Sequence, residues 1–251
     1  MNFKFIFTIL LIGHLMGDFY FQTQSMVERK NQELRVMFLH GLIYFAAIAP
    51  PFILFSMTLS VWGFIMLAPL LHIIIDYKKG WLCRKPFFEK RQGFIFVADQ
   101  CTHILILALV AYYYTTNNSV AYSMIGSHLG KIYTILIPKL SIHKLVRLVC
   151  LFLFLGKPAN IVVRQIIAIV DTNEKSDLDR DQKGRIIGIL ERYLAVILII
   201  MGQYAAVGFA FTAKSVTRFD RISKDQDFAE QYLIGTMSSL LLATIGAVMY
   251  F

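Results

Sequence analysis

Residues 3–21 of the chain read FKFIFTILLIGHLMGDFYF, an apolar run that carries His14 and Asp18 near its end. A helix needs about 20 apolar residues to cross the hydrocarbon core of a bilayer, so this run predicts a membrane-spanning helix. Because the run carries His14 and Asp18 and lacks a small-residue cleavage site, we expect a retained helix and not a signal peptide.

The whole chain has the composition of an integral membrane protein. Its 251 residues are 57% hydrophobic and 16% charged, against about 25% charged in soluble domains, and its mean hydropathy is +0.60. We therefore expect an all-α, polytopic helix bundle with about six or seven transmembrane helices. Further spans are predicted near residues 36–55, 58–77, 93–114, 142–155, 186–213 and 229–251.

The pattern predicts two domains. Residues 1–116 would form a four-helix membrane domain of two hairpins, and residues 117–251 a second membrane region of two to three helices with amphipathic and charged segments. The net charge is +9, and in membrane proteins such an excess gathers in cytoplasmic loops, so no nucleic-acid partner is expected. The basic loops at 28–35 and 78–91 are then cytoplasmic. The orientation of the second half, and whether 142–155 crosses fully, stay open.

Metal-ligand residues recur four positions apart inside the apolar runs, as in His72 with Asp76. This spacing puts both side chains on one helix face, and ionisable residues inside a membrane span mark functional sites. With the orientation above, all of them fall in the cytoplasmic leaflet. A weak repeat of the two hairpins would surround a central site. The predicted metal ligands are His14, Asp18, His40, His72, Asp76, Asp99 and His103.

Histidine nitrogen and aspartate oxygen suit divalent ions, with zinc as the first expectation and manganese or iron as alternatives. Seven ligands would hold one or two ions. Three aspartates against two divalent ions leave about one positive charge, which would attract an anion and lower the pKa of a metal-bound water. That water is the expected nucleophile, with Asp18, Asp76 or Asp99 as the candidate base.

Further polar residues are candidates for orienting the ligands or binding substrate, although each also fits ordinary interfacial polarity. Lys79, one turn beyond Asp76, could hold a phosphate. In the second half, three basic residues could form a head-group or phosphate site, with snorkelling of Arg192 as the alternative. The full set is Gln22, Lys79, Gln100, Arg192, Lys214 and Arg218.

On these residues the chain resembles a family of prokaryotic membrane proteins designated domain of unknown function 3307. The resemblance rests on 13–19 (GHLMGDF) with Gln22-Thr23, His40, His72 to Asp76 with Lys79, Asp99-Gln100 with His103, 184–188 (GRIIG) with Glu191-Arg192, Gly208-Phe209, Lys214-Ser215, Arg218-Phe219 and 233–236 (LIGT). The family designation implies no activity. A weaker similarity is to membrane-bound metal-dependent hydrolases, which carry His and His-x-x-Asp elements; it is analogy only.

The pattern favours a membrane-embedded, metal-dependent hydrolase that acts on a lipid-like or phosphorylated small-molecule substrate near the cytoplasmic leaflet of a prokaryotic inner membrane. A divalent-metal or proton transporter or channel is the first alternative, but it predicts polar groups in the outer leaflet, where the first four spans carry few. A metal-stapled membrane sensor or scaffold is the second. The lipid bilayer is the expected partner, and homo-oligomerisation stays open.

Overall fold

The computed structural model describes residues 3–55, 59–83, 92–117, 122–170 and 182–250. Within these ranges the chain is helical, and its β pairing is an isolated bridge between Phe55 and Tyr122, so the all-α prediction is confirmed. The chain forms two compact units, Met1–Cys150 and Leu151–Phe251. The boundary between these units lies inside a helix, whereas the domain division predicted from the sequence lies near residue 116.

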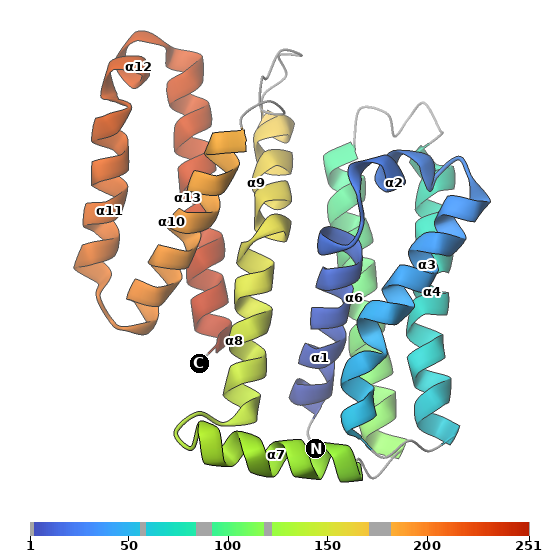
Figure 1. Ribbon diagram of the computed structural model, residues 1–251. Helices are drawn as coiled ribbons and strands as arrows, with labels where there is room; N and C mark the ends of the chain where they lie inside the picture. The colour runs from blue at the N-terminus through green and yellow to red at the C-terminus, as the bar shows by residue number, and fades with distance from the viewer. Residues whose placement is uncertain (1–2, 56–58, 84–91, 118–121, 171–181, 251) are drawn as a thin grey trace. The chain divides into compact units, whose positions relative to one another are not determined.

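Four long helices build the first unit (Figure 1). In chain order its elements are α1 (Phe3–Leu15), the π-helical turn η1 (Met16–Tyr20), α2 (Gln24–Arg29), α3 (Leu34–Ile48), the 3₁₀ helix η2 (Pro50–Leu54), α4 (Leu59–Cys83), α6 (Gln92–Asn117) and α7 (Met124–Leu136). Both α1 and α4 pack against α3 and α6, which closes a four-helix ring. Two consecutive hairpins produce such a ring.

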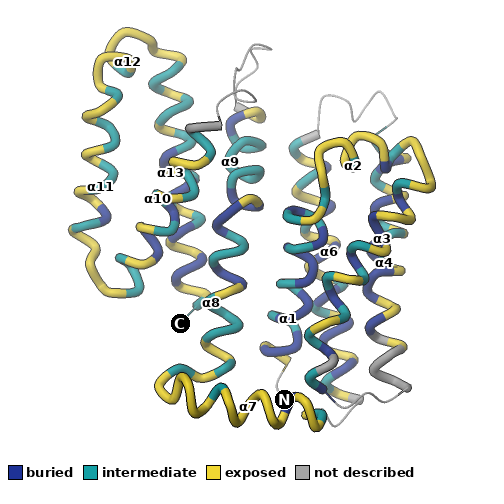
Figure 2. Tube along the Cα trace, viewed as in Figure 1, coloured by how far each residue is buried: buried dark blue, intermediate teal, exposed yellow. Residues whose placement is uncertain are grey.

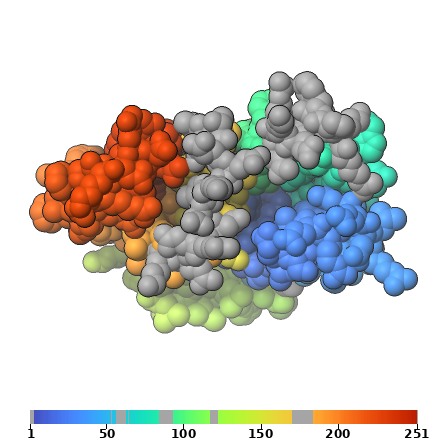
Figure 3. Space-filling model, turned by 90° about the horizontal axis from the view of Figure 1, so that it is seen from above, coloured from blue at the N-terminus to red at the C-terminus, as the bar shows by residue number. Residues whose placement is uncertain are grey.

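The two ends of this bundle differ in polarity. Apolar side chains such as Ile6, Ile48 and Leu107 fill the half next to η2 and form one continuous core. The buried ionisable side chains that the structure describes in this unit lie in the other half, next to α2. Seen along the helices, the segment around α2 and the start of α3 covers that end of the unit (blue in Figure 3).

Two glycines allow α1 and η1 to approach α3 closely. A Cβ at Gly13 would lie 2.7 Å from Cγ1 of Ile48, and a Cβ at Gly17 would lie 2.7 Å from Cδ2 of Tyr44. Small residues at membrane-helix interfaces let backbones meet in this way. The close contact fixes the neighbouring His14 and Asp18 against α3.

Helix α7 lies across the η2 end of the first unit (Figure 1). The hydroxyl of Ser123 caps it by accepting a hydrogen bond from the backbone N–H of Gly126 at 3.1 Å. Large apolar side chains on α7, among them Ile132 and Ile135, are exposed (Figure 2). An amphipathic helix of this kind suits the plane of a membrane interface.

The second unit contains a helical hairpin beside two further helices. Its elements are the end of α8 (Ile142–Leu155), α9 (Lys157–Val170), α10 (Gln182–Ile200), α11 (Tyr204–Thr217), the short α12 (Phe219–Lys224) and α13 (Gln226–Tyr250). Helices α9, α10 and α13 pack against one another, α11 packs on α10, and α12 packs on α13.

The prediction of one span over 186–213 is wrong, because the chain turns back between α10 and α11. Gly202 has a φ of +73°, a left-handed conformation that glycine adopts without steric cost. The N–H of Gln203 donates to the carbonyl of Leu198 at 2.8 Å, and the N–H of Gly202 donates to that of Ile199 at 3.0 Å. This pair of bonds is the Schellman motif that ends a helix at glycine.

Helices long and apolar enough to cross a membrane are present in both units. Among the described residues they are Phe3–Tyr20, Leu34–Phe52, Gly93–Thr116, Ile142–Ile169 and Gln226–Tyr250. Helix α4 has 25 residues, which is also long enough to cross. The span predicted at 142–155 is longer than expected, because hydrogen bonding continues past Gly156, whose carbonyl accepts from the N–H of Asn160 at 3.3 Å.

Candidate metal centre

All seven predicted ligands lie in the polar half of the first unit. They come from α1 (His14), η1 (Asp18), α3 (His40), α4 (His72, Asp76) and α6 (Asp99, His103). Asp18 has a side chain 8% exposed, and the other six residues are buried. Four helices therefore deliver three carboxylates and four imidazoles to one buried region, which is costly unless these groups share charge or a cation.

Asp18 sits in the π-helical turn that follows α1. In this turn the N–H of Phe21 donates to the carbonyl of Met16 at 2.8 Å, five residues back. Single π turns inside α-helices occur frequently at functional sites. Here Nδ1 of His14 lies 3.8 Å from Oδ2 of Asp18, while Oδ1 of Asp18 reaches the histidines of α3 and α4.

Four ligand atoms form a compact group: Nε2 of His40, Nε2 of His72, Oδ1 of Asp18 and Oδ2 of Asp76. The two nitrogens are 3.0 Å apart. His40 Nε2 lies 3.2 Å from the Asp18 oxygen and 3.3 Å from the Asp76 oxygen; for His72 Nε2 the same distances are 3.1 and 3.5 Å. Zinc bonds of 2.0–2.1 Å place tetrahedral ligands about 3.3–3.4 Å apart. The five separations, 3.0–3.5 Å, lie within a few tenths of an ångström of that edge length.

Hydrogen bonding alone satisfies this group poorly. Each Nε2 carries at most one hydrogen but faces three heavy atoms, and two N–H groups cannot point at each other across 3.0 Å. Oδ1 of Asp18 has no hydrogen-bond partner among the described residues. A cation at the centre would accept all four lone pairs at once, which is the fit expected of a metal site.

A second group of ligand atoms adjoins the first through Asp76. Ligand atoms of Asp76, Asp99 and His103 lie within 4.8 Å of one another. Nδ1 of His103 lies 2.9 Å from the backbone carbonyl of Asp99 and donates to it, so Nε2 keeps its lone pair. Nε2 of His103 and Oδ1 of Asp99 are buried with no hydrogen-bond partner in the described part of the chain. Both atoms are available for a cation.

His14 differs from the other three histidines because both of its ring nitrogens have hydrogen-bond partners. Its Nδ1 lies 3.1 Å from the Tyr44 hydroxyl, and its Nε2 lies 3.2 Å from Oε1 of Gln100. His14, Asp18 and His72 also form a group whose ligand atoms lie within 4.8 Å of one another. His14 would have to leave one of its hydrogen bonds to bind an ion directly, so its role as a ligand stays a prediction.

Two of the ring pairs join the two hairpins, and the predicted repeat stays a prediction. The rings of His40 and His72 have centroids 5.2 Å apart, and those of His14 and His103 have centroids 5.3 Å apart. Exchanging the α1–α3 hairpin with the α4–α6 hairpin maps one pair on the other. Repeats related by an axis along the membrane normal place their site at the repeat interface.

Lys30 is part of the site and was missed by sequence reasoning, which placed it in a polar loop. Its ammonium donates to Oδ2 of Asp76 at 2.7 Å, with the two side chains 7% and 2% exposed. Gln22, in the amide orientation that satisfies both of its polar atoms, donates to the Asp18 carbonyl at 3.1 Å and accepts from Lys30 at 2.9 Å. No local sequence signal distinguishes Lys30 from its neighbour Arg29.

Lys79 and Gln100 also contact the predicted ligands. The Lys79 ammonium donates to Oδ2 of Asp99 at 2.7 Å, and the amide N–H of Gln100 donates to the same oxygen at 3.1 Å. The Lys79 side chain is 24% exposed. Its hydrogen bond orients the Asp99 carboxylate, as partners of metal-binding carboxylates commonly do.

Tyr44 is the other residue that sequence reasoning missed. Its ring stacks on that of His72 with centroids 3.7 Å apart, and its hydroxyl lies 3.1 Å from Nδ1 of His14. Tyr44 follows His40 by four positions, so both lie on the same face of α3. That spacing was a usable signal.

Arg192, Lys214 and Arg218 belong to the second unit and line a pocket there. Arg192 is buried, and Lys214 pairs with Glu191 at 2.6 Å. Their contacts are with other residues of the second unit. Their predicted role in binding substrate stays a prediction.

Comparison with known proteins supports the resemblance stated from the sequence. No curated protein and no solved structure matches the chain. Residues 6–130 match the family model described as Protein of unknown function (DUF3307). The match includes all seven predicted ligands together with Gln22, Lys30, Tyr44, Lys79 and Gln100. Through this first half, the chain belongs to the DUF3307 family.

Proposed function

We propose that the protein is a membrane-embedded, metal-dependent hydrolase whose site in the first unit holds one or two divalent ions, with zinc first. The observation that carries the proposal is the close approach of His40 Nε2 and His72 Nε2 to each other and to carboxylate oxygens of Asp18 and Asp76, at 3.0–3.5 Å. His103 and Asp99 supply further open donor atoms beside Asp76. More ligands are present than one tetrahedral ion requires, which leaves donors for a second ion.

The charge of the site supports an anionic substrate. Three aspartates are accompanied by the ammonium groups of Lys30 and Lys79, so two bound divalent ions would leave a surplus of about three positive charges. Bound ions would supply Lewis acidity and an activated water. Lys30 and Lys79 hold the carboxylates of Asp76 and Asp99 in place, and the partly exposed Lys79 is positioned to meet an incoming phosphate.

The bundle beyond the site disfavours permeation. The apolar core between the metal centre and η2 is continuous, with Ile6, Ile48, Ile65 and Ala111 almost completely buried. A path for a metal ion or a proton would need polar groups through this half. A site closed on one side by apolar packing suits chemistry at one leaflet instead.

We infer that this leaflet is the cytoplasmic one of a prokaryotic inner membrane. The basic residues of 28–35, and Lys78 and Lys79 of α4, lie at the end of the bundle that holds the site, and the positive-inside rule assigns basic segments to the cytoplasm. A lipid-like or phosphorylated substrate could then enter from the lipid surface or the cytoplasm. Assays with substrates of that class would then identify which compound is hydrolysed.

The first test is elemental analysis of the detergent-purified protein, with the variants His72→Ala and His103→Ala. His128→Ala is the matched control, because His128 is an exposed histidine of α7 outside the site. Between one and about two ions per chain are expected in the wild type and the control, with loss in His72→Ala and partial loss in His103→Ala. Metal-free wild-type protein would refute the metal site and with it the hydrolase.

A second measurement distinguishes a reactive metal site from a metal ion that only holds the helices together. Cobalt-loaded protein is titrated with inorganic phosphate while its visible absorption is recorded. An open or exchangeable coordination position predicts a spectral change on anion binding. An unchanged spectrum, with no hydrolysis of phosphoester or lipid-ester substrates by zinc-loaded protein, would favour the metal-stapled scaffold instead.

A further inference from the structure

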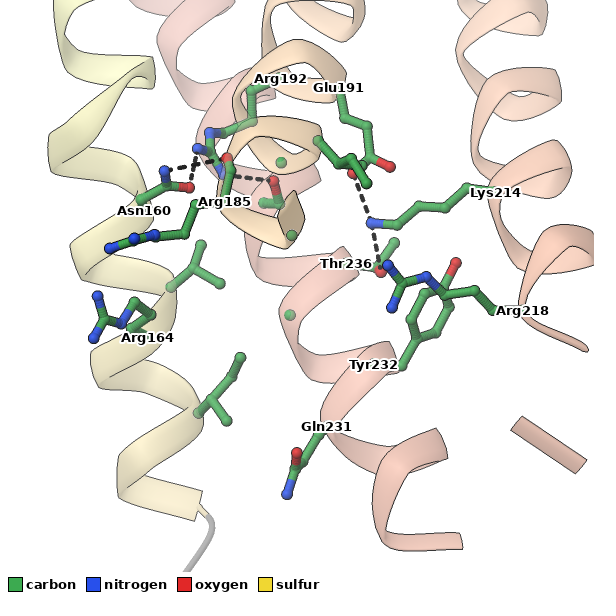
Figure 4. Close-up of a pocket in the computed structure, with 17 residues that line it drawn as sticks. Asn160, Arg164, Arg185, Glu191, Arg192, Lys214, Arg218, Gln231, Tyr232 and Thr236 are labelled. Atoms are coloured by element: carbon green, nitrogen blue, oxygen red, sulfur yellow. Dashed lines mark hydrogen bonds and ion pairs between the residues drawn. The ribbon is translucent and has the colours of Figure 1, made fainter. Parts of the chain in front are cut away.

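The second unit contains a pocket of its own, lined by α9, α10, α11 and α13 (Figure 4). Its volume is about 190 Å³. Pockets that enclose drug-sized ligands measure about 300–1,000 Å³. The pocket therefore has room for a small ion or for the polar head of a larger molecule whose remainder lies outside.

The lining is strongly cationic. Among the described residues that line it, five are basic and one, Glu191, is acidic. The basic residues are Arg164, Arg185, Arg192, Lys214 and Arg218. Lys214 donates to the Glu191 carboxylate at 2.6 Å and to the Thr236 hydroxyl at 3.3 Å, so this acid and this base compensate each other. Arg185, Arg192 and Arg218 form no ion pair with the described residues, so they remain as surplus positive charge.

Arg192 is the buried centre of this charge. It is 2% exposed, and it donates to the Leu155 carbonyl at 2.8 Å, to the Ser239 hydroxyl at 3.1 Å and to the side-chain oxygen of Asn160. These acceptors are all neutral, and the described residues provide no ion pair for this guanidinium. A buried charge without a counter-ion is unfavourable, so an anion bound beside Arg192 would stabilise this unit.

Arg185 and Arg218 are the side chains that could bind such an anion directly. Both line the pocket and are partly exposed, and neither guanidinium forms a hydrogen bond or an ion pair with any residue in the described ranges. Arg185 lies on α10, and Arg218 follows α11. Their free forks of N–H donors match the oxygens of a phosphate, with which arginine forms paired hydrogen bonds.

We propose that this pocket binds a phosphate-bearing anion, held by Arg185 and Arg218 at its mouth and electrostatically by Arg192 at its base. The ligand is either the head group of an anionic phospholipid or a soluble phosphate compound. The site is separate from the metal centre and does not depend on the hydrolase proposal.

The test uses the full-length protein in two arms. In one arm, inorganic phosphate is titrated into detergent-solubilised protein by calorimetry. In the other, the protein is reconstituted in phosphatidylcholine nanodiscs with or without phosphatidylglycerol, and retained lipid is counted by native mass spectrometry. The pocket variant is Arg185→Gln with Arg218→Gln. The matched control is Arg221→Gln with Lys224→Gln, which removes two neighbouring exposed charges outside the pocket.

Specific binding in at least one arm is expected, weakened about tenfold or more in the pocket variant and changed less than about twofold in the control. The arm that responds identifies the source of the phosphate. No binding in either arm overturns the proposal, as does an equal loss in both variants, which would indicate only general surface attraction. If the double variant fails to fold, each single variant is judged by the same criterion.

Discussion

Lys30→Met tests the link between the buried lysine and the metal centre. The Lys30 ammonium and the Asp76 carboxylate form a pair with 7% and 2% of their side chains exposed. Removing one partner of such a pair leaves an uncompensated buried charge, which costs about 3–5 kcal/mol. That cost applies to metal-free protein, in which Lys30 is the main neutraliser of Asp76.

Bound metal should reduce this cost. If Asp76 binds an ion, as its 3.3 and 3.5 Å distances to His40 and His72 indicate, its charge stays compensated after the substitution. Only a hydrogen bond to a charged group is then lost, about 1.5–3 kcal/mol. At about 2–4 °C per kcal/mol for a chain of this size, the melting temperature should fall by on the order of 10 °C without metal and by roughly half as much with it.

The assay is thermal unfolding in detergent, followed by tryptophan fluorescence, with chelator-treated and zinc-loaded protein. Both tryptophans of the chain, Trp62 and Trp81, lie on α4, which also carries Asp76. Arg29→Met is the matched control, because Arg29 forms an exposed pair with Glu33, and its loss should change the melting temperature little. An equal loss in the two Lys30→Met preparations would refute Asp76 as a metal ligand.

Three further substitutions, one of them with a matched control, probe the packing around the site and the hairpin. Tyr44→Phe removes the hydroxyl 3.1 Å from His14 but keeps the ring, so zinc affinity in a competition titration should fall about tenfold; unchanged affinity would separate Tyr44 from the metal centre. Gly17→Ala should destabilise by about 1–3 kcal/mol because its Cβ would meet the buried Tyr44 ring. Gly130→Ala, with open space around it, should be neutral or stabilising, and the same response from both would contradict the close contact. Gly202→Ala should cost about 1 kcal/mol through its positive φ, measured by chemical unfolding, and no loss would show that the turn relaxes.

The residues of the candidate site were predictable where the signal was local. His72 and Asp76, or Asp99 and His103, lie four positions apart, so helix geometry alone places each pair on one face. The shared depth followed from hydropathy and loop charge. Lys30 was not predictable in this way, because its burial depends on where α2 folds back over the bundle and meets α4. Only tertiary structure brings it to Asp76.

The wrong prediction of one span over 186–213 has a physical cause that was visible in the sequence. Gly202 follows an apolar run directly, and glycine just past the last helical residue is a common stop signal. Hydropathy alone does not reveal the turn at Gly202, because the segments on both sides of it are apolar. The turn explains why the predicted single span over 186–213 is two helices.

This hairpin also removes a conflict in the sequence. A single span over 186–213 would carry the basic segment 214–224 to the opposite side of the membrane from 184–185, against the positive-inside rule. With α10 and α11 antiparallel, the chain returns, and Lys214 meets Glu191 of α10 at 2.6 Å. Arg185 and Arg218 then line the same pocket. The positive charge of the second unit thus gathers at one end of its helices, and the rule associates that end with the cytoplasm.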